Sequence, residues 1–274
     1  MVRMVTWNIA RREEAWRSLL DTDYDIALLQ EASEPPEDVA QRIGVDRAVW
    51  RTAGADARRL WRTAVVRLSD RVSVQWLEPK SIGGACSGEL AVSRLGTLAG
   101  AIITPVQGDP FVALSLYAAW ERPCRTTNSS WIYADGSVHR LISDISALIG
   151  QERGHRIIAA GDLNILHGYG ENGSGYWAAR YATVFGRMEA LGLPFVGPQA
   201  PAGRRADPWP VELPRDSNNV PTYRTRHQTP ATASRQLDFV FASDSMAQHT
   251  QVTARNAPDD WGPSDHCRVE ITVV

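Results

Sequence analysis

The sequence is short of cysteine, of lysine and of long apolar runs, and each shortage excludes a class of protein. The 274 residues include three cysteines, which are too few and too scattered for a disulfide framework or a cysteine-rich zinc site. No apolar run approaches the roughly 18 residues of a membrane-spanning helix, so we expect no membrane association. The chain starts in the apolar segment 2–7, without the basic region and cleavage site of a secretion signal. We therefore expect a cytoplasmic protein with reduced thiols at Cys86, Cys124 and Cys267.

Lysine occurs once, as Lys80, and every other fixed side-chain cation is arginine. Arginine favours bidentate contacts with phosphate, although a GC-rich genome produces the same bias for no functional reason. The formal net charge is −2 at pH 7, so the overall charge gives no argument for nucleic acid, whose binders usually carry a basic surface. With 43% hydrophobic and 22% charged residues, the composition is that of a globular chain and excludes wholesale disorder.

Apolar runs alternate with amphipathic stretches, and this alternation predicts a mixed α and β fold. The spacing of apolar residues predicts helices over 13–20, 138–149 and 177–191, the last followed by Gly192 where a helix end favours a left-handed residue. Many predicted strands are joined by turns too short for a helix, so the sheets should be at least partly antiparallel. The predicted strands cover 4–8, 26–30, 64–68, 72–77, 90–94, 100–104, 111–116, 156–160, 237–241 and 268–273.

The length alone is compatible with one large α/β domain or with two small ones. The stretch 194–230 contains eight prolines, and so long a loop in a compact domain is usually functional or mobile. Candidate site residues lie on both sides of it. We therefore interpret 1–274 as a single domain with a proline-rich loop insertion at 194–230.

Several predicted strands end in acid or amide side chains. The strand 26–30 leads into Glu31, the strand 156–160 into Asp162 and Asn164, and the first strand ends at Asn8. Ligands of open sheets tend to bind beyond the carboxyl ends of the strands. Carboxylates without a cluster of cysteine and histidine suit a hard cation such as Mg²⁺ or Mn²⁺. These side chains therefore indicate a shared metal-dependent site.

The residue types also suggest how such a site would work. Asp162 and Asn164 are two apart on an extended segment and can face the same way, so the carboxylate can orient a water while the amide holds a phosphate oxygen. His266 can donate a hydrogen bond to a phosphoryl oxygen on which charge develops. A buried Asp238 can hold that imidazole and raise its pKa.

Each of these residues also has a purely structural explanation. Asp162 and Asp265 can be turn residues, and Asn8 can be a helix N-cap. Ser264, Asp265 and His266 are adjacent, so they cannot face one another as a catalytic triad. The chain has neither a GxSxG nucleophile elbow nor a GxxxxGK[ST] phosphate loop. Five such signals in one chain nevertheless favour a common site.

Together the motifs resemble those of the endonuclease/exonuclease/phosphatase superfamily, which includes pancreatic deoxyribonuclease, AP endonucleases and inositol-polyphosphate phosphatases. The resemblance covers nearly the whole chain. It implies a four-layer α/β/β/α sandwich of two mainly antiparallel sheets flanked by helices, with Mg²⁺ or Mn²⁺ at one edge. The matching motifs are Thr6-Trp7-Asn8, Leu29-Gln30-Glu31, Gly161-Asp162-Leu163-Asn164, Leu237-Asp238-Phe239 and Ser264-Asp265-His266.

Taken position by position, the resemblance implies a metal site around Glu31. Glu31 resembles the metal-binding glutamate of the family, and Asn8 and Asp265 complete the metal and phosphate environment. Tyr117 falls where relatives keep a histidine or tyrosine near the phosphate, although Ala118-Ala119-Trp120 then departs from the usual continuation.

The resemblance also implies roles for the other four residues. Asp162 matches the aspartate that positions or deprotonates the attacking water, and Asn164 matches the phosphate-binding amide. His266 matches the histidine on the scissile phosphate, and Asp238 matches its orienting carboxylate.

The substrate is less well defined than the chemistry. We expect phosphate-gripping arginines in the approach to Asp238, namely Arg224, Arg226 and Arg235, or a second rim formed by Arg58, Arg59 and Arg62. Candidate base-stacking residues are Trp120, Trp131 and Trp177, and the glycine-rich segment 167–175 should contact substrate.

We favour a monomeric, Mg²⁺- or Mn²⁺-dependent phosphoesterase that cleaves phosphodiester bonds of a nucleic acid or nucleotide by in-line attack of water. Two alternatives stay open. One is a phosphomonoesterase acting on a small phosphorylated metabolite or an inositol phosphate, and the other is a non-catalytic binding module on the same fold.

Overall fold

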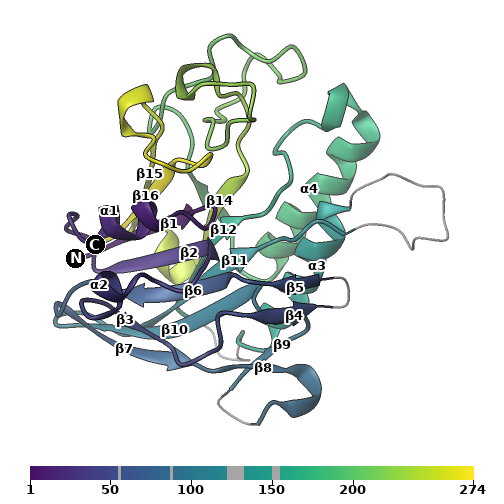
Figure 1. Ribbon diagram of the computed structural model, residues 1–274. Coiled ribbons are helices and arrows are strands. Elements are labelled where there is room, and N and C mark those ends of the chain that lie inside the picture. Colours follow the sequence, from purple (N-terminus) through teal and green to yellow (C-terminus); the bar gives the residue numbers. More distant parts are fainter. Residues whose placement is uncertain (55–56, 87–88, 122–132, 150–154) are drawn as a thin grey trace.

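The computed structural model has four layers, with two six-stranded sheets packed face to face between two layers of helices (Figure 1). Helices α1 (Glu13–Leu19) and α2 (Glu37–Ala40) cover the outer face of one sheet. Helices α3 (Ala134–Ser146) and α4 (Gly175–Ala190) cover the outer face of the other. This arrangement confirms the expected sandwich. The structure describes residues 1–54, 57–86, 89–121, 133–149 and 155–274.

The first sheet has the strand order β15-β16-β1-β2-β6-β3. Its β1–β2 pair is parallel, and the other neighbouring pairs are antiparallel. The strands are β15 (Thr250–Arg255), β16 (Arg268–Val273), β1 (Val2–Asn8), β2 (Ile26–Ala32), β6 (Arg62–Arg67) and β3 (Gly44–Val45).

The second sheet repeats this pattern with the order β13-β14-β12-β11-β10-β7, and here β11 and β12 form the parallel pair. Both sheets are therefore mainly antiparallel, as expected. The strands are β13 (Phe195–Gly197), β14 (Asp238–Ala242), β12 (Ile157–Asp162), β11 (Phe111–Tyr117), β10 (Leu98–Pro105) and β7 (Val72–Leu77).

Smaller elements complete the described part of the chain. Strands β4 (Thr52–Gly54) and β5 (Ala57–Arg59) form one short pair, and β8 (Pro79–Ser81) and β9 (Leu90–Val92) form another. Helix α5 (Asp244–Ala247) follows β14. Within the described ranges, no helix is both long and apolar enough to cross a membrane.

The ten predicted strands and three predicted helices are all present, with ends shifted by at most a few residues. Gly192 has φ +71° just beyond α4, which confirms its role at the helix end. The prediction missed the short strands β3, β4, β5, β8 and β13, the strand β15, and the helices α2 and α5. Most of these are too short to show a period of their own.

The alternation of side chains along the strands builds the core between the sheets. Met4 on β1, Ala113 on β11, Ile158 on β12 and Val240 on β14 belong to one buried cluster between the two sheets. Successive side chains of a strand point to opposite faces, and residues two apart share a face. The same inward face therefore continues to Asn8, Tyr117 and Asp162 at the ends of β1, β11 and β12, and to Asp238 at the start of the antiparallel β14.

A buried glutamine connects the two sheets next to these strand ends. Gln30 is fully buried, and its Nε2 donates to Thr6 Oγ1 at 3.1 Å and to Ser115 Oγ at 3.0 Å. Thr6 and Ser115 lie two residues before Asn8 and Tyr117, on opposite sheets. The hydrogen bonds of Gln30 therefore hold the ends of β1 and β11 at a fixed distance from each other.

The proline-rich segment 194–230 is more structured than a loop insertion. It begins with β13, which pairs with β14 at the edge of the second sheet. Near its other end, Thr222 Oγ1 accepts a hydrogen bond from the backbone N–H of Asp238 at 3.1 Å, and the N–H of Cys267 donates to the Thr222 carbonyl at 2.8 Å. The segment thus supports the backbone on both sides of the Asp238–His266 pair.

Candidate active site

A cavity of about 770 Å³ opens where the two parallel strand pairs end. Asn8 and Glu31 reach it from the first sheet, and Tyr117 and Asp162 reach it from the second. His266 comes from the loop before β16. Residues distant in sequence therefore meet at one edge of the sandwich, as the strand-end motifs predicted.

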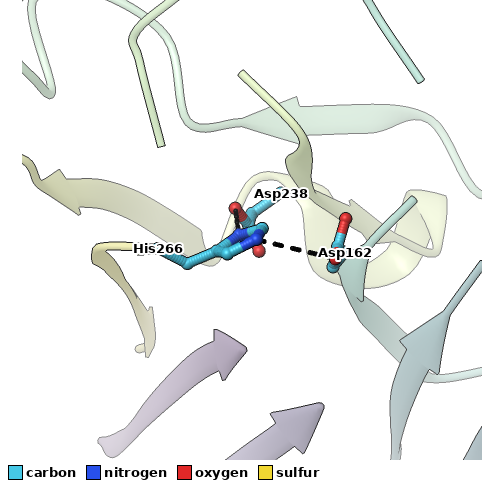
Figure 2. Close-up of side chains that lie close together, drawn as sticks. All are labelled: Asp162, Asp238 and His266. Carbon is cyan, nitrogen blue, oxygen red and sulfur yellow. Dashed lines mark hydrogen bonds and ion pairs between the residues drawn. The ribbon is translucent and has the colours of Figure 1, made fainter. Parts of the chain in front are cut away.

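At the base of this cavity, His266 lies between two buried carboxylates (Figure 2). Its Nδ1 is 2.8 Å from Asp238 Oδ2, and its Nε2 is 3.8 Å from Asp162 Oδ2. The first distance is a hydrogen bond, whereas the second is an ion-pair distance. Asp238 thus fixes the ring and leaves Nε2 facing Asp162.

The loop carrying His266 is anchored to β1. Ser264 Oγ donates to the Asn8 carbonyl at 2.6 Å and accepts from the His266 backbone N–H at 3.1 Å. The indole N–H of Trp7 donates to the His266 carbonyl at 2.9 Å. These bonds make Ser264 a backbone anchor for the histidine.

Asp162 is held by amides on either side. Its Oδ2 accepts from Asn8 Nδ2 at 3.0 Å and from Asn164 Nδ2 at 3.1 Å, and its Oδ1 accepts from the Asn164 backbone N–H at 2.9 Å. Asn164 has φ +51°, and its side chain turns back on Asp162. Both amides therefore orient the carboxylate, whereas the sequence predicted that the Asn164 amide would hold a phosphate oxygen.

Burial and the neighbouring charges raise the pKa values of both Asp162 and His266. Burial raises the pKa of Asp162 to about 7, the His266 charge opposes the rise, and Asp238 adds to it. Burial lowers the pKa of His266, but the Asp238 and Asp162 carboxylates outweigh it and raise the pKa to about 10. Slightly above neutral pH, the site therefore combines an ionised Asp162 with a protonated His266.

Glu31 reaches the cavity through an irregularity in β2. Strand alternation alone would put it on the helix side with Ala27 and Leu29, which belong to the outer core cluster. The register of β2 against β6 shifts between Leu29 and Ala32, and Glu31 has φ +45°. A bulge of this kind re-aims a side chain, and here it places Glu31 in the cavity.

The partners of Glu31 come from both sides of the cavity. Its Oε1 accepts a hydrogen bond from the Tyr117 hydroxyl at 3.1 Å, and its Oε2 lies 3.7 Å from Arg11 Nε. Burial raises the pKa of Tyr117 well above its usual value, and the Glu31 carboxylate adds to this, so the phenol stays protonated. Tyr117 therefore serves as a donor beside the acidic groups.

Backbone strain is concentrated around this cavity. Among the residues that the structure describes, five non-glycine residues have φ in the left-handed region, and all five line the cavity. Such conformations cost on the order of 1–3 kcal/mol each and cluster at functional sites. The five are Ala10, Arg11, Glu31, Asn164 and Asn172.

Aromatic side chains form a second wall of the cavity, and of these Trp177 was predicted to contact substrate. Tyr223 packs on His266 with ring centroids 4.9 Å apart, and Trp177 and Tyr181 of α4 line the same space. Tyr181 lies in the segment 177–191 that the apolar spacing predicts as a helix, and it is buried. Only the position of α4 relative to the strand ends shows that its edge also borders the cavity.

The predicted arginine rims are mostly not brought to the site. Arg235 lines the cavity, where it pairs with Glu171 of the glycine-rich segment at 3.0 Å. Arg224 and Arg226 lie outside the lining. Arg62 is wrong as a rim residue, because it is buried and pairs with Asp46 at 2.8 Å.

Other expected substrate residues have mixed outcomes. Arg59 lies over the Trp61 ring, 5.1 Å from its centroid, rather than in the cavity lining. Asp265 and Trp120 line the cavity, together with Glu171 and Asn172 of the segment 167–175. The side chain of Arg58, and the residues Cys124 and Trp131, fall outside the part of the chain that the structure describes.

The fold agrees with the comparisons to known proteins. The model of the Endonuclease/Exonuclease/phosphatase family matches residues 5–266. The chain therefore belongs to the Endonuclease/Exonuclease/phosphatase family, whose members are hydrolases that act on phosphoesters. A search of curated proteins gives no match.

Solved structures with the same fold include nucleases and a phosphatase. The catalytic domain of APE2 from Xenopus laevis has a TM-score of 0.66 at 15% identity, with 99% of this chain and 91% of that chain covered. The endonuclease domain of TRAS1, a telomere-specific non-LTR retrotransposon, has a TM-score of 0.61 at 17% identity, with 100% and 98% covered. The 3′ phosphatase NExo from Neisseria, bound to a product DNA hairpin, has a TM-score of 0.56 at 14% identity over the full length of both chains. At these identities the likeness concerns the fold.

Family members use divalent metals, and the donor set of this cavity fits one. Glu31, Asn8 and Asp265 offer carboxylate and amide oxygens to the same cavity, which are the ligands that Mg²⁺ and Mn²⁺ prefer. A second candidate group consists of Asp162, Asp238 and His266, whose ligand-type atoms lie within 4.8 Å of one another. In that group His266 Nδ1 is hydrogen-bonded to Asp238, so His266 Nε2 and the Asp162 carboxylate are the atoms available to bind a metal ion.

Proposed function

We propose that this protein is a divalent-metal-dependent phosphoesterase that hydrolyses phosphodiester bonds of a nucleic acid or a nucleotide. The observation that carries the proposal is the buried Asp238–His266–Asp162 constellation, with the Glu31 carboxylate in the same cavity. A binding module has no need for a buried histidine whose pKa is raised beside an aspartate whose pKa is near neutrality.

In this proposal Glu31, Asn8 and Asp265 hold Mg²⁺ or Mn²⁺. When bound, the cation withdraws charge from the phosphoryl oxygens. Tyr117 donates a hydrogen bond to Glu31 and so holds the carboxylate toward the cavity. The bulge at Glu31 is the structural reason that this residue, rather than Gln30, faces the ligand space.

The reaction begins with Asp162 in its ionised form. Its carboxylate accepts a proton from the attacking water while the water oxygen bonds to phosphorus and the bond to the leaving oxygen breaks. His266 is protonated and donates from Nε2 to a phosphoryl oxygen as charge develops there. Asp238 keeps the ring in that orientation, and Asn8 and Asn164 keep Asp162 in place.

The charge of the cavity favours a substrate with few phosphates. Among its described lining residues, Arg11 and Arg235 are the arginines, against four acidic residues, Glu31, Asp162, Glu171 and Asp265. Both arginines are already paired with carboxylates. Because His266 and the bound cation act on the reacting phosphate, these arginines leave little positive charge for the further phosphates of an inositol polyphosphate. A single phosphodiester flanked by neutral groups would be well matched.

A substrate panel tests this proposal. The panel contains single- and double-stranded DNA, RNA, cyclic nucleotides, a phosphomonoester and inositol phosphates, each with Mg²⁺ or Mn²⁺ and with an EDTA control. We expect metal-dependent cleavage of at least one nucleic acid or nucleotide diester. Preferential release of inorganic phosphate from the monoester would favour the phosphomonoesterase instead. Absence of turnover with every substrate and both metals would indicate a binding module.

A further inference from the structure

Trp120 is an exposed tryptophan held in one orientation at the rim of the cavity. Its side chain is 55% exposed, although tryptophan is highly buried on average. Its indole N–H donates to Asn164 Oδ1 at 3.0 Å. The backbone N–H of Ala118 donates to the Asp162 carbonyl at 2.9 Å, which ties the start of this segment to β12. The ring is therefore fixed beside the amide that contacts Asp162.

The same hydrogen bond determines the orientation of that amide. Because Asn164 Oδ1 accepts from the indole, its Nδ2 faces Asp162 Oδ2 at 3.1 Å and the Ala118 carbonyl at 3.2 Å. Trp120 is thus connected to the catalytic carboxylate through one side chain. A group resting on the indole would lie next to the reacting phosphate.

Other aromatic groups extend the apolar part of the lining. Trp177 and Tyr181 of α4 border the cavity, and their rings stack with an interplanar angle of 29° and centroids 6.0 Å apart. Leu237, next to Asp238, also contributes to the lining. Combined with two paired arginines, this lining suits a neutral, flat group better than further phosphates.

We propose that Trp120 is a stacking platform for a nucleobase attached to the phosphoester that the site cleaves. The proposal rests on the proposed phosphoesterase function and defines its substrate class. The base would be unpaired, either in a free nucleotide or at the end of a nucleic acid strand, because a base within a duplex has no free face to stack. Base–aromatic stacking contributes about 5- to 150-fold in affinity per base.

The test measures binding without turnover. The probes are the phosphonate analogue of AMP, whose P–C bond cannot be hydrolysed, and the corresponding ribose phosphonate without a base. Calorimetry in the presence of Mg²⁺ gives the ratio of their dissociation constants. We expect the wild type to prefer the adenosine compound by about 5- to 150-fold, and Trp120→Ala to bind both compounds with similar affinity.

Two further variants separate stacking from the hydrogen bond and from folding. Trp120→Phe removes the indole N–H but keeps a ring, so most of the preference should remain. Trp209→Phe is the matched control, because Trp209 also donates its indole N–H, to the Leu213 carbonyl at 2.9 Å, but lies outside the cavity lining. It should keep the full preference.

Equal affinities of the wild type for both compounds, or an unchanged preference in Trp120→Ala, would overturn the stacking proposal. Neither result would affect the phosphoesterase proposal, which depends on turnover. Conversely, a Trp120-dependent preference in a protein that hydrolyses no phosphoester would keep the base subsite and refute the proposed reaction. Repeating the comparison with a short single strand that carries either a normal or an abasic end distinguishes a nucleic acid from a free nucleotide.

Discussion

The hydrogen bond between Asp238 and His266 should make the stability of this protein depend on pH in a defined window. Asp238 is fully buried, and its Oδ2 lies 2.8 Å from His266 Nδ1. The substitution Asp238→Asn keeps the shape of the side chain and removes its charge. Burial, which lowers the pKa of His266, would then be opposed by Asp162 and, more weakly, by Asp265.

The size of the effect follows from the change in pKa. The folded protein raises the pKa of His266 from 6.5 to about 10, and one pKa unit corresponds to about 1.4 kcal/mol. Because Asp238, Asp162 and Asp265 all raise this pKa, we assign Asp238 about half of the shift, which is on the order of 2 kcal/mol. A raised histidine pKa stabilises the fold fully below pH 6.5, and this stabilisation disappears as the pH rises to about 10.

Urea unfolding in EDTA at pH 7.5 and at pH 10.5 measures this difference. These two values lie above the folded pKa of Asp162, about 7, so that its titration contributes little to the comparison. We expect the wild type to lose more stability between them than Asp238→Asn, by about 2 kcal/mol. Equal losses in the two proteins would refute the assignment of Asp238 as the group that keeps His266 charged.

As a kinetic counterpart, the double alanine variant of Asp238 and His266 should be little worse in kcat/KM than His266→Ala, because the two act as one unit. Fully additive losses would contradict the pairing.

Three further predictions concern other residues of the cavity. Glu31→Gln should keep the fold but weaken Mg²⁺ binding in calorimetry, and unchanged Mg²⁺ affinity would show that Glu31 is not a ligand. The kcat of the wild type should fall below about pH 7 as Asp162 becomes protonated. In a kcat profile at saturating metal, Asp162→Asn should flatten this acidic limb, and an intact limb would exclude Asp162 as the base. Asn164→Ala should lower the whole curve by up to about 10²-fold and keep its shape, because the amide positions the Asp162 carboxylate without accepting the proton. Ala10→Gly should raise the free energy of unfolding by about 1 kcal/mol. Ala10 has φ +47°, and glycine adopts this conformation without strain. A destabilised variant would show that the alanine methyl group contributes more to stability than the strain costs.

Much of the site was predictable because strand periodicity propagates to the strand ends. Met4 and Asn8 share a face of β1, and Ile158 and Asp162 share a face of β12, so the buried pattern of each strand indicates where its polar end points. The matching order of the motifs then indicated that these ends meet. The structure confirms that they surround one cavity.

The rest depends on contacts that periodicity does not encode. Glu31 reaches the cavity through a bulge, and nothing in the alternation of β2 predicts that irregularity. Arg62 reads as a surface cation, yet it is buried because Asp46 and the Trp50 ring, 4.0 Å from its guanidinium carbon, compensate its charge. Tyr223 packs on His266 only because the proline-rich segment returns to the site after more than twenty residues without a regular repeat.

The central claim is that the carboxylate of Asp162 acts on water in a metal-dependent hydrolysis. The most direct measurement is kcat/KM for a nucleoside p-nitrophenyl phosphodiester with saturating Mg²⁺, in the wild type and in Asp162→Asn, after circular dichroism has shown that both are folded. We expect turnover that EDTA abolishes and a loss of about 10²–10⁴-fold in the variant. Equal rates in the two proteins, or turnover that persists in EDTA, would contradict it.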